Sequence, residues 1–254
     1  MTKEEALFQY TLRQGDTALI LGHKLSEWCG HGPKLEQDIA LINIALDLVG
    51  QSRSYLEYAA QVENKNRDED DLAYRRYEQD FRNILLAEQP NGNWGRTIMR
   101  SFYFDVFHYL FLHELVKSKD SQLAAIAQKS LKEVTYHVKH NADREILKGD
   151  GTEESHEKMQ TAANNLWMYT GEMFDMDEVD DILIEAGIAP DLKPLKAKWF
   201  QKVKEVFEEA TLKLPPEDAW MQSGGRLKGV HSEELGFILA EMQYLPRAYP
   251  DATW

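Results

Sequence analysis

Four long segments of the chain are rich in helix-forming residues, whereas the strict apolar–polar alternation typical of half-buried strands is scarce. The segments come in two pairs, and only a few residues separate the members of each pair. Gly30–Pro33 separates the first pair, and Asp120 is the expected N-cap of the last segment. The sequence therefore predicts two helical hairpins, with helices over about residues 2–29, 35–63, 96–118 and 120–148.

A crossover of roughly thirty residues joins the two hairpins. Its composition predicts an exposed loop over residues 64–71, a shorter helix over 72–86 and a turn over 89–95. In the last third of the chain, the sequence predicts weaker helices over residues 155–174, 177–187, 191–211 and 232–249. A long irregular connection is expected over residues 215–229. No domain boundary stands out, so we expect one domain over 1–254, with a core bundle at about 2–148 and a C-terminal helical extension over about 152–254.

An all-α bundle with a single long crossover is the ferritin-like arrangement. We therefore predict an all-α fold, a ferritin-like four-helix bundle with additional C-terminal helices. Di-iron members of this class place a lone carboxylate on the first and third helices and a Glu-x-x-His motif on the second and fourth. This rule gives a specific test for a metal site in the present chain.

Composition excludes several classes of function. The net charge is −14 and no stretch is dominated by Lys and Arg, so nucleic acid is not an expected partner, because phosphate binding requires a basic face. No apolar run reaches the ~18 residues of a membrane span, and the N-terminus lacks the pattern of a signal peptide. Cys29 is the only cysteine, which fits a reducing compartment. We expect a cytoplasmic protein that does not contact a membrane.

Residues 39–50 pose a specific question about the second helix. Ten of these twelve residues are apolar or glycine, and only Asn43 and Asp47 interrupt them. A helix that is apolar on all sides is normally buried. A carboxylate in the middle of such a helix requires a partner.

One acid lies near the middle of each of the four predicted helices. In an antiparallel hairpin, residues equidistant from the turn face each other, and Asp16 and Asp47 lie 14 and 13 residues from the first turn. Asp105 and Glu133 each lie 14 residues from Lys119 in the second turn. At ~1.5 Å per residue all four acids are expected at the same height in the bundle. They match the carboxylate half of a di-iron site.

The histidine half of that site is missing at the expected positions. Three residues after Asp47 stands Gly50, and three after Glu133 stands Tyr136. Iron of this type requires an imidazole as well as carboxylates. We therefore predict a degenerate site that holds no metal.

Three histidines nevertheless follow the acids at spacings that return to the same helical face: His23, His108 and His137. In one interpretation the acids crowd a metal-free core and are neutralised by neighbours or by protons. In the other, displaced histidines still bind a metal, and the protein is an independent di-iron-type oxidase using the four acids with His108 and His137. We favour the first, because ligand geometry rarely survives such shifts.

Other candidates are less specific. Cys29 near His31 suggests a thiol site, although a lone cysteine is commonly a small buried apolar residue. For His137 and His140 we expect one side chain to face inward and the other outward. Residues 224–229, GGRLKG, match no phosphate-loop pattern and predict an ordinary mobile loop. The aromatic residues within 102–111 are expected in the core or at a partner interface.

Three strings carry a family resemblance that covers nearly the whole chain: Thr11–Arg53, Leu85–Trp94 and Leu239–Trp254. The chain resembles the ferritin-like C subunits of bacterial phenylacetyl-coenzyme A monooxygenases, the 1,2-epoxidases. In that family a homologous catalytic subunit carries the di-iron centre and inserts one oxygen atom into the aromatic ring. A reductase subunit with FAD and an iron–sulfur cluster supplies electrons from NADPH.

The resemblance implies a non-catalytic structural role in phenylacetate degradation. The family's structural subunit pairs with the catalytic one and has lost its iron ligands, which agrees with Gly50 and Tyr136. It implies no cofactor in this chain, and hetero-oligomeric partners that include the catalytic and reductase subunits. Apolar residues of the first three helices outside the core are the candidates for the interface with the catalytic subunit.

Overall fold

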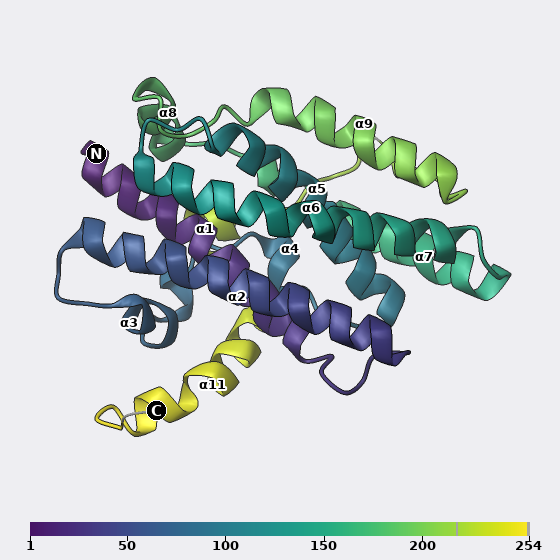
Figure 1. Ribbon diagram of the computed structural model, residues 1–254, viewed down its shortest axis with the longest axis horizontal. Coiled ribbons are helices and arrows are strands. Elements are labelled where there is room, and N and C mark those ends of the chain that lie inside the picture. Colours follow the sequence, from purple (N-terminus) through teal and green to yellow (C-terminus); the bar gives the residue numbers. More distant parts are fainter. Residues whose placement is uncertain (217, 253–254) are drawn as a thin grey trace.

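The computed structural model describes residues 1–216 and 218–252, and its regular elements within these ranges are all helices. The predicted all-α, ferritin-like fold is confirmed. Two long hairpins form its body, as Figure 1 shows. Their helices are α1 (Lys3–Ser26) with α2 (Leu35–Glu63), and α5 (Trp94–Leu115) with α6 (Ser121–Gly149), each end within three residues of its predicted position.

Local capping explains where these helices begin. Thr2 and Glu5 form a reciprocal capping box at the start of α1. The Asn93 side chain accepts from the Arg96 N–H at 2.9 Å, and the Asp120 side chain accepts from the Leu123 N–H at 2.9 Å. Each cap satisfies a backbone donor that has no partner inside the helix. The predicted role of Asp120 is confirmed.

The crossover differs from its prediction. The single helix predicted over 72–86 is wrong, because the chain forms α3 (Glu69–Tyr74), the 3₁₀ turn η1 (Glu78–Asp80) and α4 (Leu85–Glu88). Asp68 caps α3 one turn earlier than expected. The backbone is then extended at Phe81 and Ile84. Arg76 follows Arg75, the C-cap residue of α3, and its buried side chain donates to the Leu72 carbonyl.

The last third of the chain packs against both hairpins and the crossover. Its helices are α7 (Glu153–Trp167), η2 (Gly171–Phe174), α8 (Glu178–Glu185), α9 (Lys193–Glu209), α10 (Gly225–Lys228) and α11 (Glu233–Ala248). The helix predicted over 155–174 is interrupted after Trp167, and the irregular segment 215–229 contains α10; Glu217 in that segment lies outside the described residues. α7 and α9 pack on α5 and α6, and α8 packs on α1. α11 leaves the bundle beside α3 (Figure 1).

One hydrophobic cluster extends from Ala6 to Leu239 and includes buried residues of both hairpins and of the C-terminal helices. Five of the six aromatic residues within 102–111 are buried members of this cluster, and the sixth, Tyr109, packs against it. Trp199 of α9 donates its indole N–H to the Tyr103 carbonyl at 2.9 Å, which fixes α9 against α5. The aromatic stripe is therefore core.

Candidate functional site

Asp16 of α1 is fully buried and is bound by the crossover. The guanidinium of Arg76 forms an ion pair with both carboxylate oxygens, and the Arg82 backbone N–H donates to Oδ2 at 2.8 Å. The Arg76 side chain is itself 5% exposed and lies over the Phe81 ring. A buried carboxylate requires such compensation. Asp16 thus has a cation as its partner, supplied by a segment outside the four long helices.

Asp105 of α5 is equally buried but has no cation bonded to it within residues 1–216 and 218–252. Asn141 of α6 donates to its Oδ2 at 2.6 Å, whereas Oδ1 has no hydrogen-bond partner in the same ranges. Burial raises the pKa of Asp105 from 3.8 to about 6, while the nearby His137 and the Asn141 hydrogen bond act in the opposite direction. Burial thus moves the titration of this carboxyl toward neutral pH.

The remaining two acids lie along the seam between α2 and α6, where the two hairpins meet. Oδ2 of Asp47 lies 2.9 Å from Nε2 of His137, and Glu133 accepts from Gln51 at 2.9 Å. The Asp47 side chain is 36% exposed, so its charge is partly hydrated. The carboxylate in the apolar segment 39–50 thus has a histidine of the other hairpin as its partner.

The two positions where iron-binding histidines are expected lie at the surface. A Cβ atom placed on Gly50 would meet nothing within 4 Å in the described part of the chain. Tyr136 is 49% exposed. Neither position directs a side chain into the interior near Asp105. This arrangement explains why glycine and tyrosine are tolerated there.

The three histidines singled out from the sequence have different surroundings. His137 is buried against Asp47, and it lies close enough to Asp105 and His108 to affect their pKa values. Burial, followed by the charge of His137, lowers the pKa of His108 to about 3, and burial also lowers that of His23. The structure therefore gathers His108, His137, Asp47 and Asp105 in one region. Asp16 faces the crossover instead.

Asn141 and Arg76 are partners that the sequence reasoning missed. Asn141 follows His137 by four residues and Glu133 by eight, so helical periodicity would have placed it on the same inner face. Arg76 gave no such signal, because its segment was interpreted as a continuous helix. Its position depends on the turn between α3 and η1.

Several other sequence-based expectations need correction. His137 and His140 are both buried, so the prediction that one faces outward is wrong. Cys29 is exposed, contrary to its interpretation as a buried apolar residue. The segment 224–229 is anchored, because the buried Glu172 accepts from the backbone N–H groups of Gly224 at 2.8 Å and Arg226 at 3.0 Å. That carboxylate occupies the donors a phosphate would need.

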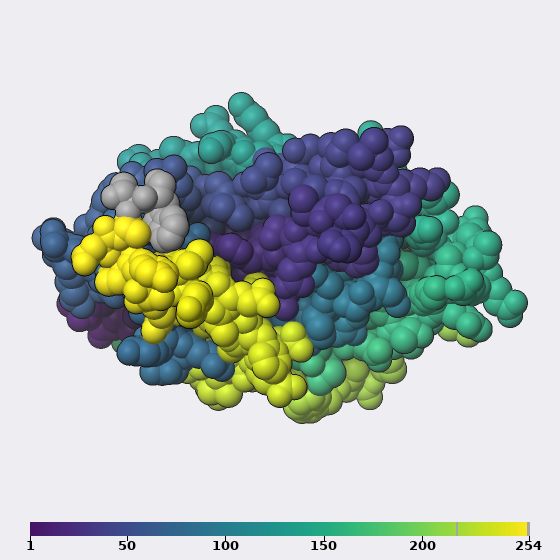
Figure 2. Space-filling view, turned by 90° about the horizontal axis from the view of Figure 1, so that it is seen from below, coloured from purple at the N-terminus to yellow at the C-terminus, as the bar shows by residue number. Residues whose placement is uncertain are grey.

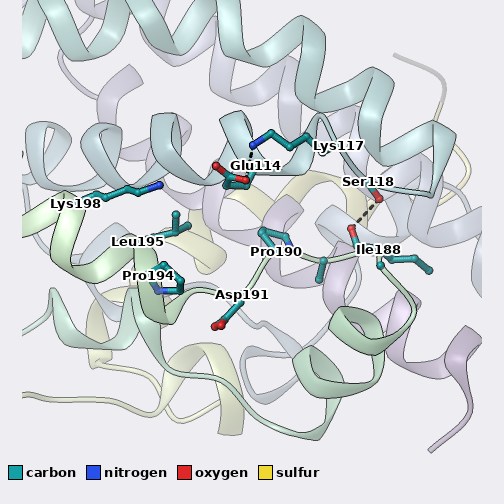
Figure 3. Close-up of a pocket in the computed structure, with 11 residues that line it drawn as sticks. Glu114, Lys117, Ser118, Ile188, Pro190, Asp191, Pro194, Leu195 and Lys198 are labelled. Atoms are coloured by element: carbon teal, nitrogen blue, oxygen red, sulfur yellow. Dashed lines mark hydrogen bonds and ion pairs between the residues drawn. The ribbon is translucent and has the colours of Figure 1, made fainter.

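A surface pocket of about 340 Å³ lies between the end of α5 and the start of α9, and its lining includes none of the four mid-helix acids. Figure 3 shows Lys117 and Lys198 reaching toward Glu114 from either side. The Lys117 ammonium donates to Glu114 at 2.6 Å and is the main cause of the lowered pKa of that carboxyl. The charges of the rim largely compensate one another, which does not favour an ion-binding site.

Comparison with known proteins places this geometry in context. The model of a protein family described as "Phenylacetic acid catabolic protein" matches residues 1–254. The chain belongs to this family. A curated relative, the C subunit of the 1,2-phenylacetyl-CoA epoxidase of Escherichia coli (strain K12), is 49% identical over 248 residues, which cover 98% of this chain and 99% of the relative.

The side chains of this protein do not fit a di-iron centre at the predicted height. Asp16 is held by Arg76, position 50 carries no side chain, and Tyr136 points to the surface. Across residues 1–216 and 218–252, no group of three or more His, Cys, Asp or Glu side chains is arranged to hold a metal ion. The metal content of the protein stays a prediction. Within the same described ranges, none of the helices combines the length and apolar character that a membrane crossing requires.

Proposed function

We propose that this chain is a non-catalytic structural subunit of a multicomponent phenylacetyl-coenzyme A 1,2-epoxidase in aerobic phenylacetate degradation. In this proposal it pairs with a homologous di-iron catalytic subunit and stabilises it. Iron resides in that partner, and FAD, an iron–sulfur cluster and NADPH act through a reductase subunit. The complex is cytoplasmic. The whole-length similarity to a curated subunit of such an epoxidase supports the enzyme system.

The observation that supports the non-catalytic role is that the side chains at the expected iron-ligand positions are bonded to other groups or are not ligands. A ligand carboxylate must be free to approach a metal, but Asp16 is held by a guanidinium and a backbone N–H. Gly50 and Tyr136 offer no imidazole. The interior has therefore exchanged metal binding for ion pairs and hydrogen bonds that stabilise the fold.

An exposed apolar stripe on α2 supports the pairing. Leu35, Ile39 and Leu46 recur at helical spacing on one face, and they are 71%, 51% and 63% exposed. The expectation that this apolar helix is buried on all sides thus fails within the single chain. Large apolar side chains aligned in this way mark an interaction surface. A homologous bundle can cover the stripe about a pseudo-two-fold axis, burying more than ~2,000 Å² as obligate interfaces do.

Co-expression with the homologous catalytic subunit tests both parts of the proposal. We expect a stable complex, iron bound in the catalytic subunit, negligible iron in this chain purified alone, and turnover that requires both chains. About two irons per isolated chain would instead identify the independent oxidase. Full turnover by the catalytic subunit alone would exclude a structural role.

The stripe is tested by a matched pair of substitutions. Leu46→Glu places a charge on α2, whereas Phe237→Glu places one on α11 at nearly equal exposure, 62% against 63%. We expect Leu46→Glu to weaken complex formation at least tenfold, since ~1.4 kcal/mol of lost apolar burial is sufficient. Phe237→Glu should leave it unchanged. The reverse result would show that α11, rather than α2, meets the catalytic subunit.

A further inference from the structure

The start of α11 is fixed to the crossover by one buried contact. Figure 2 shows α11 lying on the surface of the molecule, as the yellow ridge beside the first hairpin. His231 and Ser232 precede its first residue, Glu233. The side chains of His231 and of Glu88 in α4 are both 0% exposed and lie 2.8 Å apart. This contact joins residues 143 positions apart in the sequence.

Both ring nitrogens of His231 face hydrogen-bond acceptors. Nδ1 lies 2.8 Å from the Glu88 carboxylate, and Nε2 lies 3.0 Å from the Phe81 carbonyl oxygen. A neutral imidazole has a single N–H, so it would leave one acceptor facing a lone pair. An imidazolium donates to both.

The surroundings of Glu88 favour its ionised form. Its carboxylate accepts from the Asn83 amide at 2.8 Å and from the Ser232 backbone N–H at 2.7 Å, in addition to the contact with His231. A protonated Glu88 would have to donate to His231 while still accepting both of these bonds. Three converging donors stabilise a carboxylate anion, and the buried anion in turn stabilises a cation beside it.

We propose that His231 is held as an imidazolium and acts as a pH-sensitive latch, which fixes the start of α11 to α4 and releases it at alkaline pH. The charged groups near His231 are Glu88 of α4, the Arg82 guanidinium, which donates to the same Phe81 carbonyl at 2.7 Å, and, at longer range, Asp16 of α1, whose own charge is paired with Arg76. α10 contributes Gly225, which is uncharged. On α11 itself, Glu234 is directed to Lys24.

The direction of the pH effect follows from these contacts. Burial lowers the pKa of His231, but the hydrogen bond and charge of Glu88, the Phe81 carbonyl and the charge of Asp16 together raise it above its ordinary 6.5. The stabilising contribution of the latch is therefore complete below pH 6.5 and is lost as the pH rises through the higher folded-state pKa. Further along α11, Gln243 and Arg247 bond the Arg76 carbonyl at 3.1 and 2.8 Å. Release therefore begins at the first turn of α11.

Ring-nitrogen NMR of the full-length chain with ¹⁵N-labelled histidine tests the protonation state directly. His231→Gln assigns the signal, and His113, which is 56% exposed, serves as the internal reference. We expect both nitrogens of His231 to remain protonated at a pH where His113 is neutral. A neutral His231 at pH 6.5, protonated at Nε2 alone, would overturn the proposal.

Amide hydrogen exchange tests the latch itself. We express exchange as a protection factor, which corrects for the intrinsic rise of amide exchange with pH. As His231 loses its proton, protection in the first turn of α11 should fall about tenfold for each unit by which the pKa is raised, while protection in α6 stays unchanged. In His231→Gln, exchange in this turn should be fast at every pH, with no transition. Exchange in wild type that does not follow the His231 titration would show that the contact is structural and carries no switch. If His231→Gln does not fold, the proposal is still tested in wild type, by whether exchange in the first turn of α11 follows the titration of His231.

Discussion

Asp16 and Asp105 occupy corresponding places in the two hairpins, and both are almost completely buried. Asp16 is bonded by the guanidinium of Arg76, whereas Asp105 is bonded by the neutral amide of Asn141. The same residue type at the same predicted height has therefore been stabilised in two ways. One is a fixed ion pair, and the other is a carboxyl whose pKa burial has raised to about 6.

In the proposed metal-free role, the difference shows how an interior can keep its acids without a metal. Two cations in a di-iron site compensate four carboxylates at once, and each carboxylate needs a substitute when the cations are absent. The crossover supplies a cation to the first hairpin. The second hairpin supplies only the neutral amide of Asn141, and the pKa of Asp105 is raised. The two solutions are expected to respond oppositely to mutation.

The largest effect is expected when the cation is removed. Arg76→Leu leaves the carboxylate of Asp16 buried beside a single backbone N–H, and loss of one partner of a buried pair costs about 3–5 kcal/mol. We expect the urea midpoint of unfolding to fall accordingly. Arg53→Leu is the matched control, because Arg53 forms a surface pair with Glu69 at 3.2 Å and is 73% exposed. It should leave the midpoint unchanged.

The double variant Asp16→Asn/Arg76→Leu separates charge from packing. It removes both charges together, so we expect it to recover most of the stability lost in Arg76→Leu. If the double variant is as unstable as the single one, the Arg76 side chain acts through its contacts with Phe81 and the crossover carbonyls. The contrast with Asp105 would then be one of packing rather than of charge.

Asp105→Asn is expected to raise the free energy of unfolding at neutral pH, whereas Arg76→Leu lowers it. An acid whose folded-state pKa is raised contributes stability below its unfolded value of 3.8, and that contribution is lost as pH rises through about 6. Ionisation of Asp105 thus destabilises the native state at neutral pH, by at most about 3 kcal/mol. The asparagine cannot ionise and still accepts from Asn141.

The measurement is the free energy of unfolding from pH 3.5 to pH 8. Asp105→Asn should be more stable than wild type at pH 8 by about 1–3 kcal/mol, with the difference shrinking toward zero below pH 4. A pH-independent difference would mean that Asp105 does not titrate in this range. A less stable variant at pH 8 would show that the carboxylate charge is compensated by His137.

Features that depend on local sequence were predictable, whereas those that depend on contacts between distant segments were not. The four long helices follow from local propensity and capping, as Thr2 and Asp120 illustrate. Each of the four acids lies within the helix predicted for it, but position along a helix does not fix the direction of a side chain around the helix axis. Asp105 points inward while Asp47 lies at the seam.

The partners of the acids also differ in whether the sequence could have indicated them. Asn141 lies on the same helical face as His137 and could have been inferred from spacing. Arg76 could not, because its contact with Asp16 spans 60 residues and depends on turns that interrupt the crossover helix. Tertiary contacts of this kind override local helix propensity. The exposure of the α2 stripe could likewise not be predicted, because the sequence does not show whether an apolar residue is covered by this chain or by a partner.

Asp47 provides the third and smallest test. Its side chain is 36% exposed, so hydration already compensates much of its charge, unlike that of Asp16 or Asp105. An asparagine oxygen can still accept from Nε2 of His137, and we expect Asp47→Asn to cost about 0.5–1 kcal/mol or less. In the assembled complex, iron content and turnover should stay at the wild-type level, as measured by metal analysis and product formation. A collapse of turnover with the complex intact would place Asp47 in the chemistry, and the interpretation of these acids as metal-free remnants would then be wrong.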